Sequence, residues 1–142
     1  MLFLCTIHFG CLILKKFILF LIGGIGYGLI EVIWRGYTHI SMLFAGGICF
    51  NIFSAIGKRF RKEEWFKIFL LGSLAVTAVE FVFGIIFNLI LKKKVWDYSN
   101  MPFNILGQVC PLYSLFWGIL CIAFVPLAKI CEKRINIGLQ KE

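Results

Sequence analysis

The stretch Trp65–Leu91, WFKIFLLGSLAVTAVEFVFGIIFNLIL, decides the fold, because its 27 residues include only one base, Lys67, and one acid, Glu80. About 20 apolar residues are enough to cross the hydrocarbon core of a bilayer as a helix. Backbone polar groups in lipid must be hydrogen-bonded within the chain, so a spanning segment of this kind is helical. The stretch therefore predicts a transmembrane helix.

Three further apolar runs, at 17–34, 41–57 and 111–128, predict three more spans. The whole composition agrees, because 61% of the 142 residues are hydrophobic and only 15% are charged. A soluble domain has about 45–50% apolar and about 25% charged residues, and a small one cannot bury more. We therefore expect a single all-α integral membrane domain, a four-span transmembrane helical bundle. Residues 1–14 are too short to span, and we expect an inner-face helix or an extension of the first span.

The net charge of +8 is interpreted as a topology signal. Eleven of the 15 basic residues fall on the side of both termini and of the 58–67 loop, and four fall on the other side. Because positively charged loops stay in the cytoplasm, we expect a multi-pass protein of the cytoplasmic membrane with both termini cytoplasmic. Its expected partner is the lipid bilayer. Nucleic acid is not expected, because no nucleic-acid-binding motif accompanies the charge.

The segment 95–110, VWDYSNMPFNILGQVC, is too long for a tight turn and too apolar for a water-exposed loop. Pro102 can start a short helix, because proline is tolerated at the first helical position. We expect a re-entrant or interfacial segment at the outer face, as a short helix or a re-entrant piece. Irregular backbone at that depth must be buried in protein or line a wet cavity.

Two carboxylates lie inside predicted spans, where a charge costs at least a few kcal/mol unless it is paired or hydrated. Glu31 is ~21 Å above Phe17, and Glu80 is ~21 Å above Phe66, at a helical rise of about 1.5 Å per residue. The two carboxylates are therefore expected at similar depth. Each is a functional candidate by default.

Helical spacing gathers small and polar residues on one face of each span, and such faces permit close helix contact and hydrogen bonds across it. In the third span this face holds Ser73, Thr77, Glu80, Gly84 and Asn88. Four such faces can meet within one bundle. The candidate residues for binding a solute or an ion are Glu31, Arg35, Asn51, Glu80, Asn88, Trp96, Asp97, Tyr98, Ser99, Asn104, Gln108 and Ser114.

The same charges also allow a purely structural interpretation. Arg35 follows Glu31 by four residues, so the two can pair on one helix face. Arg35 can equally bridge to Glu80 or to Asp97. A Glu–Arg–Glu cluster of this kind would clasp the helices together without binding any substrate, and both interpretations stay open at this point.

Catalytic and metal-binding motifs are mostly missing. The sequence has no nucleophile elbow, no H-E-x-x-H and no phosphate loop, so we expect neither an enzyme nor a cofactor. The spacing Cys5-x-x-His8-x-x-Cys11 can place three ligands on one helix face. A structural zinc site needs a fourth ligand, so no metal site is predicted.

Two segments resemble a known family: GLIEVIWRGYTHISMLFAGGICF (28–50) and TAVEFVFGIIFNLILKKKVWDYSNMPFNILGQVCPLYSLFWGIL (77–120). They are similar to the CmpB-like, type IV ABC-transporter permease family of small bacterial membrane proteins. The most specific part is the run W-D-Y-S…P-F-N…G-Q…C-P-L-x-S-x-x-W-G from Trp96 to Gly118. The Glu31-x-x-x-Arg35 pair and the E-F-x-x-G at Glu80 also match.

The resemblance implies a small permease-like transport or channel component, with Glu31, Arg35, Glu80 and Asn88 as a polar intramembrane site. Trp96, Asp97, Asn104 and Gln108 would then form its outer lid. Four spans are few for half a transporter, so we expect a homo-oligomer or other transporter subunits, including an ATPase. The alternative is a non-transporting structural or partner-binding membrane subunit held by the Glu/Arg ion-pair cluster.

Overall fold

The computed structural model describes residues 2–139, with side chains for residues 10–138. Four long helices dominate it: α1 (Leu2–Arg35), α2 (Ile40–Arg59), α3 (Trp65–Phe83) and α4 (Pro111–Leu139). Two short helices flank α3, the 3₁₀-helix η1 (Lys62–Glu64) and the π-helix η2 (Gly84–Ile90). Four helical segments of the described chain are long and apolar enough to cross a membrane. The prediction of an all-α, four-span membrane protein is confirmed.

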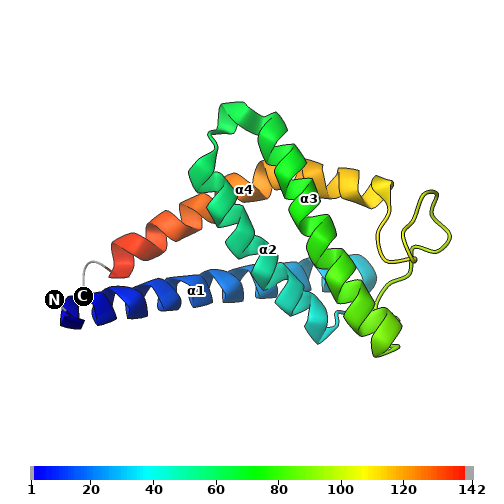
Figure 1. Cartoon of the computed structure of the whole chain (residues 1–142), viewed down its shortest axis with the longest axis horizontal. Helices are drawn as coiled ribbons and strands as arrows, with labels where there is room; N and C mark the ends of the chain where they lie inside the picture. The colour runs from blue at the N-terminus through cyan, green and yellow to red at the C-terminus, as the bar shows by residue number, and fades with distance from the viewer. Residues whose placement is uncertain (1, 140–142) are drawn as a thin grey trace.

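The helices pack as two pairs, α1 with α2 and α3 with α4, and α2 contacts all three other long helices (Figure 1). Small residues allow these close contacts. A Cβ at Gly24 would lie 2.6 Å from the carbonyl oxygen of Leu43, and a Cβ at Gly72 would lie 2.5 Å from the Cβ of Cys121. A larger residue at either glycine would push the paired helices apart, because packed interiors leave no room for added atoms.

The first and the last helix extend beyond the predicted spans. The N-terminal apolar segment continues directly into the first span, so α1 is one helix of 34 residues, which is about 51 Å at the usual rise. Of the two forms expected for residues 1–14, the structure has the extension from Leu2 onward. The last helix likewise continues past residue 128 to Leu139.

The short helix expected at Pro102 is not present, since residues 91–110 form turns and one isolated bridge between Ile105 and Val109. The Asn104 side chain explains this difference. Its amide donates to the carbonyl oxygens of Ser99 and Met101, and its oxygen accepts from the Gly107 N–H. Such side-chain bonds to nearby backbone compete with helix formation. Whether this loop enters the bilayer stays a prediction.

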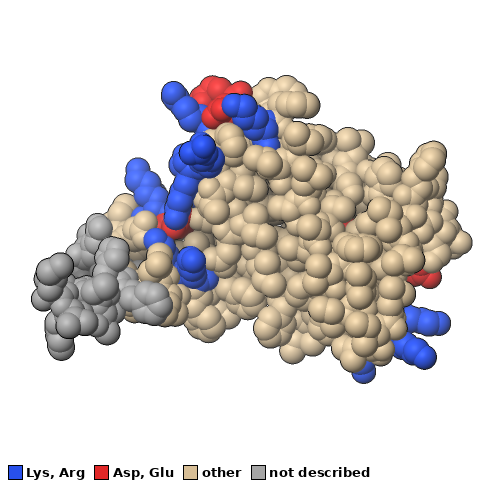
Figure 2. All heavy atoms as spheres, in the orientation of Figure 1, with Lys and Arg blue, Asp and Glu red and all other residues tan. Residues whose placement is uncertain are grey.

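Charged side chains gather at the two ends of the molecule, and the surface between them is almost free of charge (Figure 2). We call the end with the 36–39 turn and the 91–110 loop the loop end. The opposite end, with Lys15, the 58–67 hairpin and the 129–134 stretch of α4, is the terminal end. This distribution suits a chain whose middle lies in hydrocarbon.

Candidate functional site

Glu31 lies at the loop end of α1, is only 8% exposed, and pairs with Arg35 on the next helical turn. The Arg35 Nη2 donates to Glu31 Oε1 at 2.7 Å, and the Thr38 hydroxyl donates to Oε2 at 2.6 Å. Arg35 also donates from Nη1 to the carbonyl oxygen of Val95, at 3.0 Å. The pair therefore ties the end of α1 to the start of the 95–110 loop.

Glu80 is equally buried, at 7% exposed, but it has no basic partner within the described residues. Its Oε1 accepts from the Tyr98 hydroxyl at 2.8 Å, and its Oε2 accepts from the indole Nε1 of Trp117 at 3.1 Å. The bridge from Arg35 to Glu80 or Asp97, left open by the sequence, is absent from the ion pairs of the described chain. Glu31 and Glu80 thus belong to two separate polar networks.

A third network surrounds Asn88, which lies on the π-helical turn after α3. Its Nδ2 donates to the Trp96 carbonyl and to Gln108 Oε1, and its Oδ1 accepts from the Val95 N–H. Because Val95 also binds Arg35, the Glu31 and Asn88 networks meet at one loop residue. Widened π-helical turns often occur at functional sites.

Gln108 is buried against the π-helix, and the lack of a side chain at Gly84 makes room for it. A Cβ at Gly84 would lie 2.6 Å from Gln108 Oε1. The Gln108 carbonyl also accepts from the Trp96 indole, and its Nε2 donates to the Leu106 carbonyl. These bonds fix the return of the loop toward α4.

The tip of the loop is held by its own polar side chains. Asp97 Oδ1 accepts from both the backbone N–H and the hydroxyl of Ser99. These two hydrogen bonds lower the pKa of Asp97 below its ordinary value. Burial, together with the negative charge of Glu80 and the hydrogen bond to it, raises the pKa of Tyr98. The Tyr98 hydroxyl is the donor of the hydrogen bond to Glu80.

Two of the predicted residues lie away from these networks. The Asn51 amide donates to the carbonyls of Gly47 and of Lys16, and Lys16 is 15 residues, about 22 Å, before Glu31 on α1. Ser114 links α4 to α3. Its hydroxyl accepts a hydrogen bond from the Thr77 hydroxyl, and its backbone carbonyl accepts one from the Ser73 hydroxyl. Both residues join helices without contacting Glu31 or Glu80.

Sequence reasoning missed three participants. Trp117 belongs to the W-G that ends the family motif, but nothing in the sequence indicated that it contacts Glu80. Thr38 had no signal of its own, because it reaches Glu31 across a turn. Glu132 did have a signal, because Cys121, Val125 and Ala128 are buried on α4 and Glu132 continues the same spacing.

Glu132 forms the main polar cluster of the terminal end and is only 4% exposed. Its Oε1 lies 3.2 Å from Lys15 Nζ and 2.6 Å from Lys58 Nζ, and its Oε2 accepts from the Ser54 hydroxyl. One buried carboxylate thus joins α1, α2 and α4. Two lysines balance its charge, unlike that of Glu80.

No group of three or more potential metal ligands gathers among the residues described. The side chains of Cys5 and His8 lie outside the described set. The structure therefore adds nothing to the Cys-His-Cys spacing noted in the sequence.

Over residues 2–140 the chain matches the family described as "Putative ABC-transporter type IV". No curated protein and no solved structure matches the chain. The matched range includes all four spans, the loop and each of the polar networks. The chain is therefore a multi-pass membrane protein that belongs to this type IV ABC-transporter-related family.

Proposed function

We propose that the chain is a small permease-like component of a membrane transporter, with Glu80 as the residue that binds a cationic solute or ion. The observation that carries this proposal is the charge balance around Glu80. Its carboxylate is buried and accepts two neutral hydrogen bonds, but no cation of the described chain faces it. An unpaired carboxylate in a membrane span is costly and marks a functional site by default.

The loop would act as a lid over this site. Tyr98 reaches from the loop to Glu80, and the bonds of Asn88, Trp96 and Gln108 hold the base of the loop against the π-helix. A solute entering from the loop end would have to displace the Tyr98 hydroxyl.

Membership in the family supports a transport role and further subunits. We propose that the chain acts without catalysis of its own, as a homo-oligomer or with an ATPase. The 58–67 hairpin is the segment of the terminal end that an ATPase would contact. Both termini would be cytoplasmic, and an impermeant thiol reagent applied to intact cells would then leave Cys131 unlabelled until lysis.

A second function is favoured by the other two clusters. Glu31 is fully paired with Arg35 and Thr38, and Glu132 is paired with two lysines. Such networks hold helices together without any solute, as expected for a structural or partner-binding subunit. The two proposals differ at Glu80: the transport proposal expects it to bind a cation, and the structural-subunit proposal does not.

The test is stabilisation of the purified protein by cations in detergent. A ligand present at 100 times its dissociation constant stabilises a fold by about 2.7 kcal/mol. A panel of inorganic and organic ammonium cations should contain one that raises the melting temperature of wild type and not that of Glu80→Gln. Glu63→Gln, which alters an exposed carboxylate at the terminal end, should respond like wild type.

Flux into proteoliposomes of the cation identified in this way should then be lost in Glu80→Gln. If no cation stabilises wild type, or if Glu80→Gln responds equally, the structural-subunit proposal replaces the transport proposal.

A further inference from the structure

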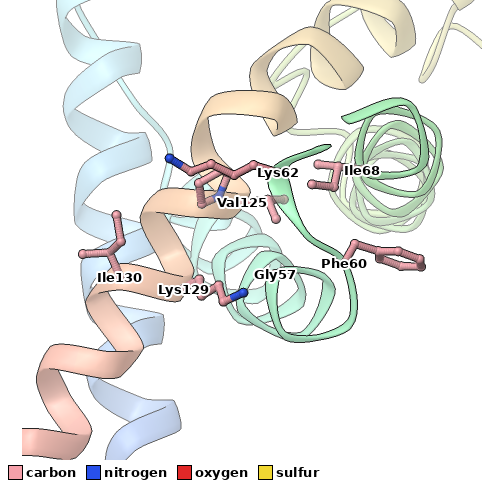
Figure 3. Close-up of a pocket in the computed structure, with 8 residues that line it drawn as sticks. Gly57, Phe60, Lys62, Ile68, Val125, Lys129 and Ile130 are labelled. Carbon is pink, nitrogen blue, oxygen red and sulfur yellow. The ribbon is translucent and has the colours of Figure 1, made fainter. Parts of the chain in front are cut away.

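Two adjoining hollows, of about 190 and 240 Å3, open at the terminal end where α2, η1, α3 and α4 meet. They share Lys62, Ile68 and Pro126 in their walls. Together they form one groove, which we call the terminal groove. Lys62 and Lys129 line it from different elements, η1 and α4, and in Figure 3 their ammonium groups point in different directions.

The walls of the terminal groove are apolar apart from these two lysines, with Phe60, Val125 and Ile130 in one hollow and Ile122 and Ala123 in the other. Ile122 and Ile130 are exposed on the outside of the bundle. The groove therefore opens toward the surrounding lipid. An apolar chain lying in it would cover surface that the protein itself leaves uncovered.

The depth of the groove matches the boundary between hydrocarbon and headgroups. Lys129 lies 18 residues after Pro111 on α4, which is about 27 Å along the helix. The hydrocarbon core of a bilayer is about 30 Å thick. With the start of α4 at one boundary, Lys129 and the mouth of the groove lie near the other.

The charge at this end is not balanced within the part of the chain that the structure describes. Each described acid here already has a base: Glu63 contacts Arg61, Glu64 contacts Lys67, and Glu132 contacts Lys15 and Lys58. Lys62 and Lys129 form no ion pair within the described chain. The two ammonium groups at the groove are therefore available to an anion from outside.

Pro126 adds a polar group to the wall. Proline has no backbone N–H, so the carbonyl oxygen of Ile122 cannot accept its usual helical hydrogen bond. Ile122 and Pro126 line the same hollow. Ile122 lies seven residues, about 10 Å, before Lys129 on α4, so this carbonyl is at the depth of the acyl chain and takes no part in binding the headgroup.

We propose that the terminal groove is a binding site for an anionic phospholipid of the leaflet at the terminal end. The phosphate lies between Lys62 and Lys129, and an acyl chain follows the apolar wall toward Ile122. Basic pockets between transmembrane helices commonly bind anionic headgroups in this way. The site is separate from Glu80 and does not depend on a transport role.

The test is native mass spectrometry of the full chain released from detergent after titration with phosphatidylglycerol or phosphatidylcholine. The wild-type protein should retain phosphatidylglycerol in preference to phosphatidylcholine. A lysine near an anionic headgroup strengthens binding by roughly fivefold, and two do so by roughly 25-fold. The double variant Lys62→Gln/Lys129→Gln should lose that preference, and Lys133→Gln/Arg134→Gln, with two basic residues at the same end but outside the groove, should keep it.

The acyl chain is tested by Ala123→Phe, which fills one hollow and keeps both lysines. This variant should also retain less phosphatidylglycerol, with a helical circular dichroism spectrum and a melting temperature like those of wild type. Equal retention of the two lipids by wild type, unchanged retention in the Lys62/Lys129 variant or in Ala123→Phe, or displacement by soluble glycerol phosphate would each overturn the proposal.

Discussion

Glu80 and Glu132 are the same residue type, almost equally buried, at opposite ends of one bundle. Glu132 is held by two lysines and a serine, whereas Glu80 is held by a tyrosine and a tryptophan without any cation of the described chain. Burial alone does not distinguish them. The difference lies in the charge of their partners.

That difference separates a structural role from a binding role. A carboxylate balanced by two lysines has no need of a ligand, and its removal leaves buried positive charge behind. The negative charge of a carboxylate with only neutral donors stays uncompensated. A cation from outside would balance that charge. The Glu31–Arg35 pair, with one acid and one base, is closer to Glu132 than to Glu80.

The largest expected effect is therefore at Glu132. Glu132→Gln removes the negative charge between Lys15 and Lys58, and breaking one side of a buried ion pair costs about 3 kcal/mol. Lys58 is half exposed, so most of the loss comes from Lys15. Unfolding titrations in mixed detergent micelles should show the decrease.

The matched control for this variant is Glu63→Gln, because Glu63 also pairs with a base but is exposed. Exposed ion pairs contribute about 0–1 kcal/mol. Equal losses in the two variants would contradict a structural role for the Glu132 cluster.

The next effect concerns the base of the loop, at Gly84. Gly84→Ala places a Cβ 2.6 Å from Gln108 Oε1, and overpacking of this kind costs about 1–3 kcal/mol. It should lower the melting temperature and loosen the 91–110 loop, seen as faster amide exchange there. Gly26→Ala is the control, because a Cβ at Gly26 meets nothing within 4 Å, and it should be neutral or slightly stabilising.

The four spans were predictable because the length of an apolar run is a property of the sequence alone. The glycine-bearing faces were predictable for the same reason, because helical periodicity fixes which residues share a face. Gly24 of α1 accordingly lies against Leu43 of α2. The sequence alone did not indicate the π-helix at Gly84–Ile90. In the structure the Gln108 side chain packs against Gly84, and this contact comes from the folded loop.

The candidate site was less predictable, because its contacts depend on the path of the 91–110 loop. Asn104 fixes that path by side-chain bonds to its own neighbours. Only the folded loop brings the Tyr98 hydroxyl within hydrogen-bond distance of Glu80, and the Val95 carbonyl within hydrogen-bond distance of Arg35. The charges could be listed from the sequence, but their partners could not.

A smaller effect is expected when Glu80 becomes neutral. Glu80→Gln loses one charge-assisted acceptor, and it also relieves the cost of an unpaired buried charge. We expect these changes to offset each other, leaving stability within about 1 kcal/mol of wild type. Unfolding titrations under the same conditions should show that Glu132→Gln loses at least three times as much free energy of unfolding as Glu80→Gln. Equal losses would mean that charge balance does not distinguish the two ends.

The smallest effect is at Asp97 on the exposed loop, whose only hydrogen-bond partner among the described residues is Ser99. Because its folded pKa is lowered, Asp97 contributes stability above its unfolded pKa of about 3.9. That stability is lost as the pH falls through the lower folded pKa. The difference in melting temperature between wild type and Asp97→Asn should therefore be present at neutral pH and vanish in strong acid. A difference that does not change with pH would mean that the loop tip is held by Asn104 and the turn geometry, and not by the Asp97 charge.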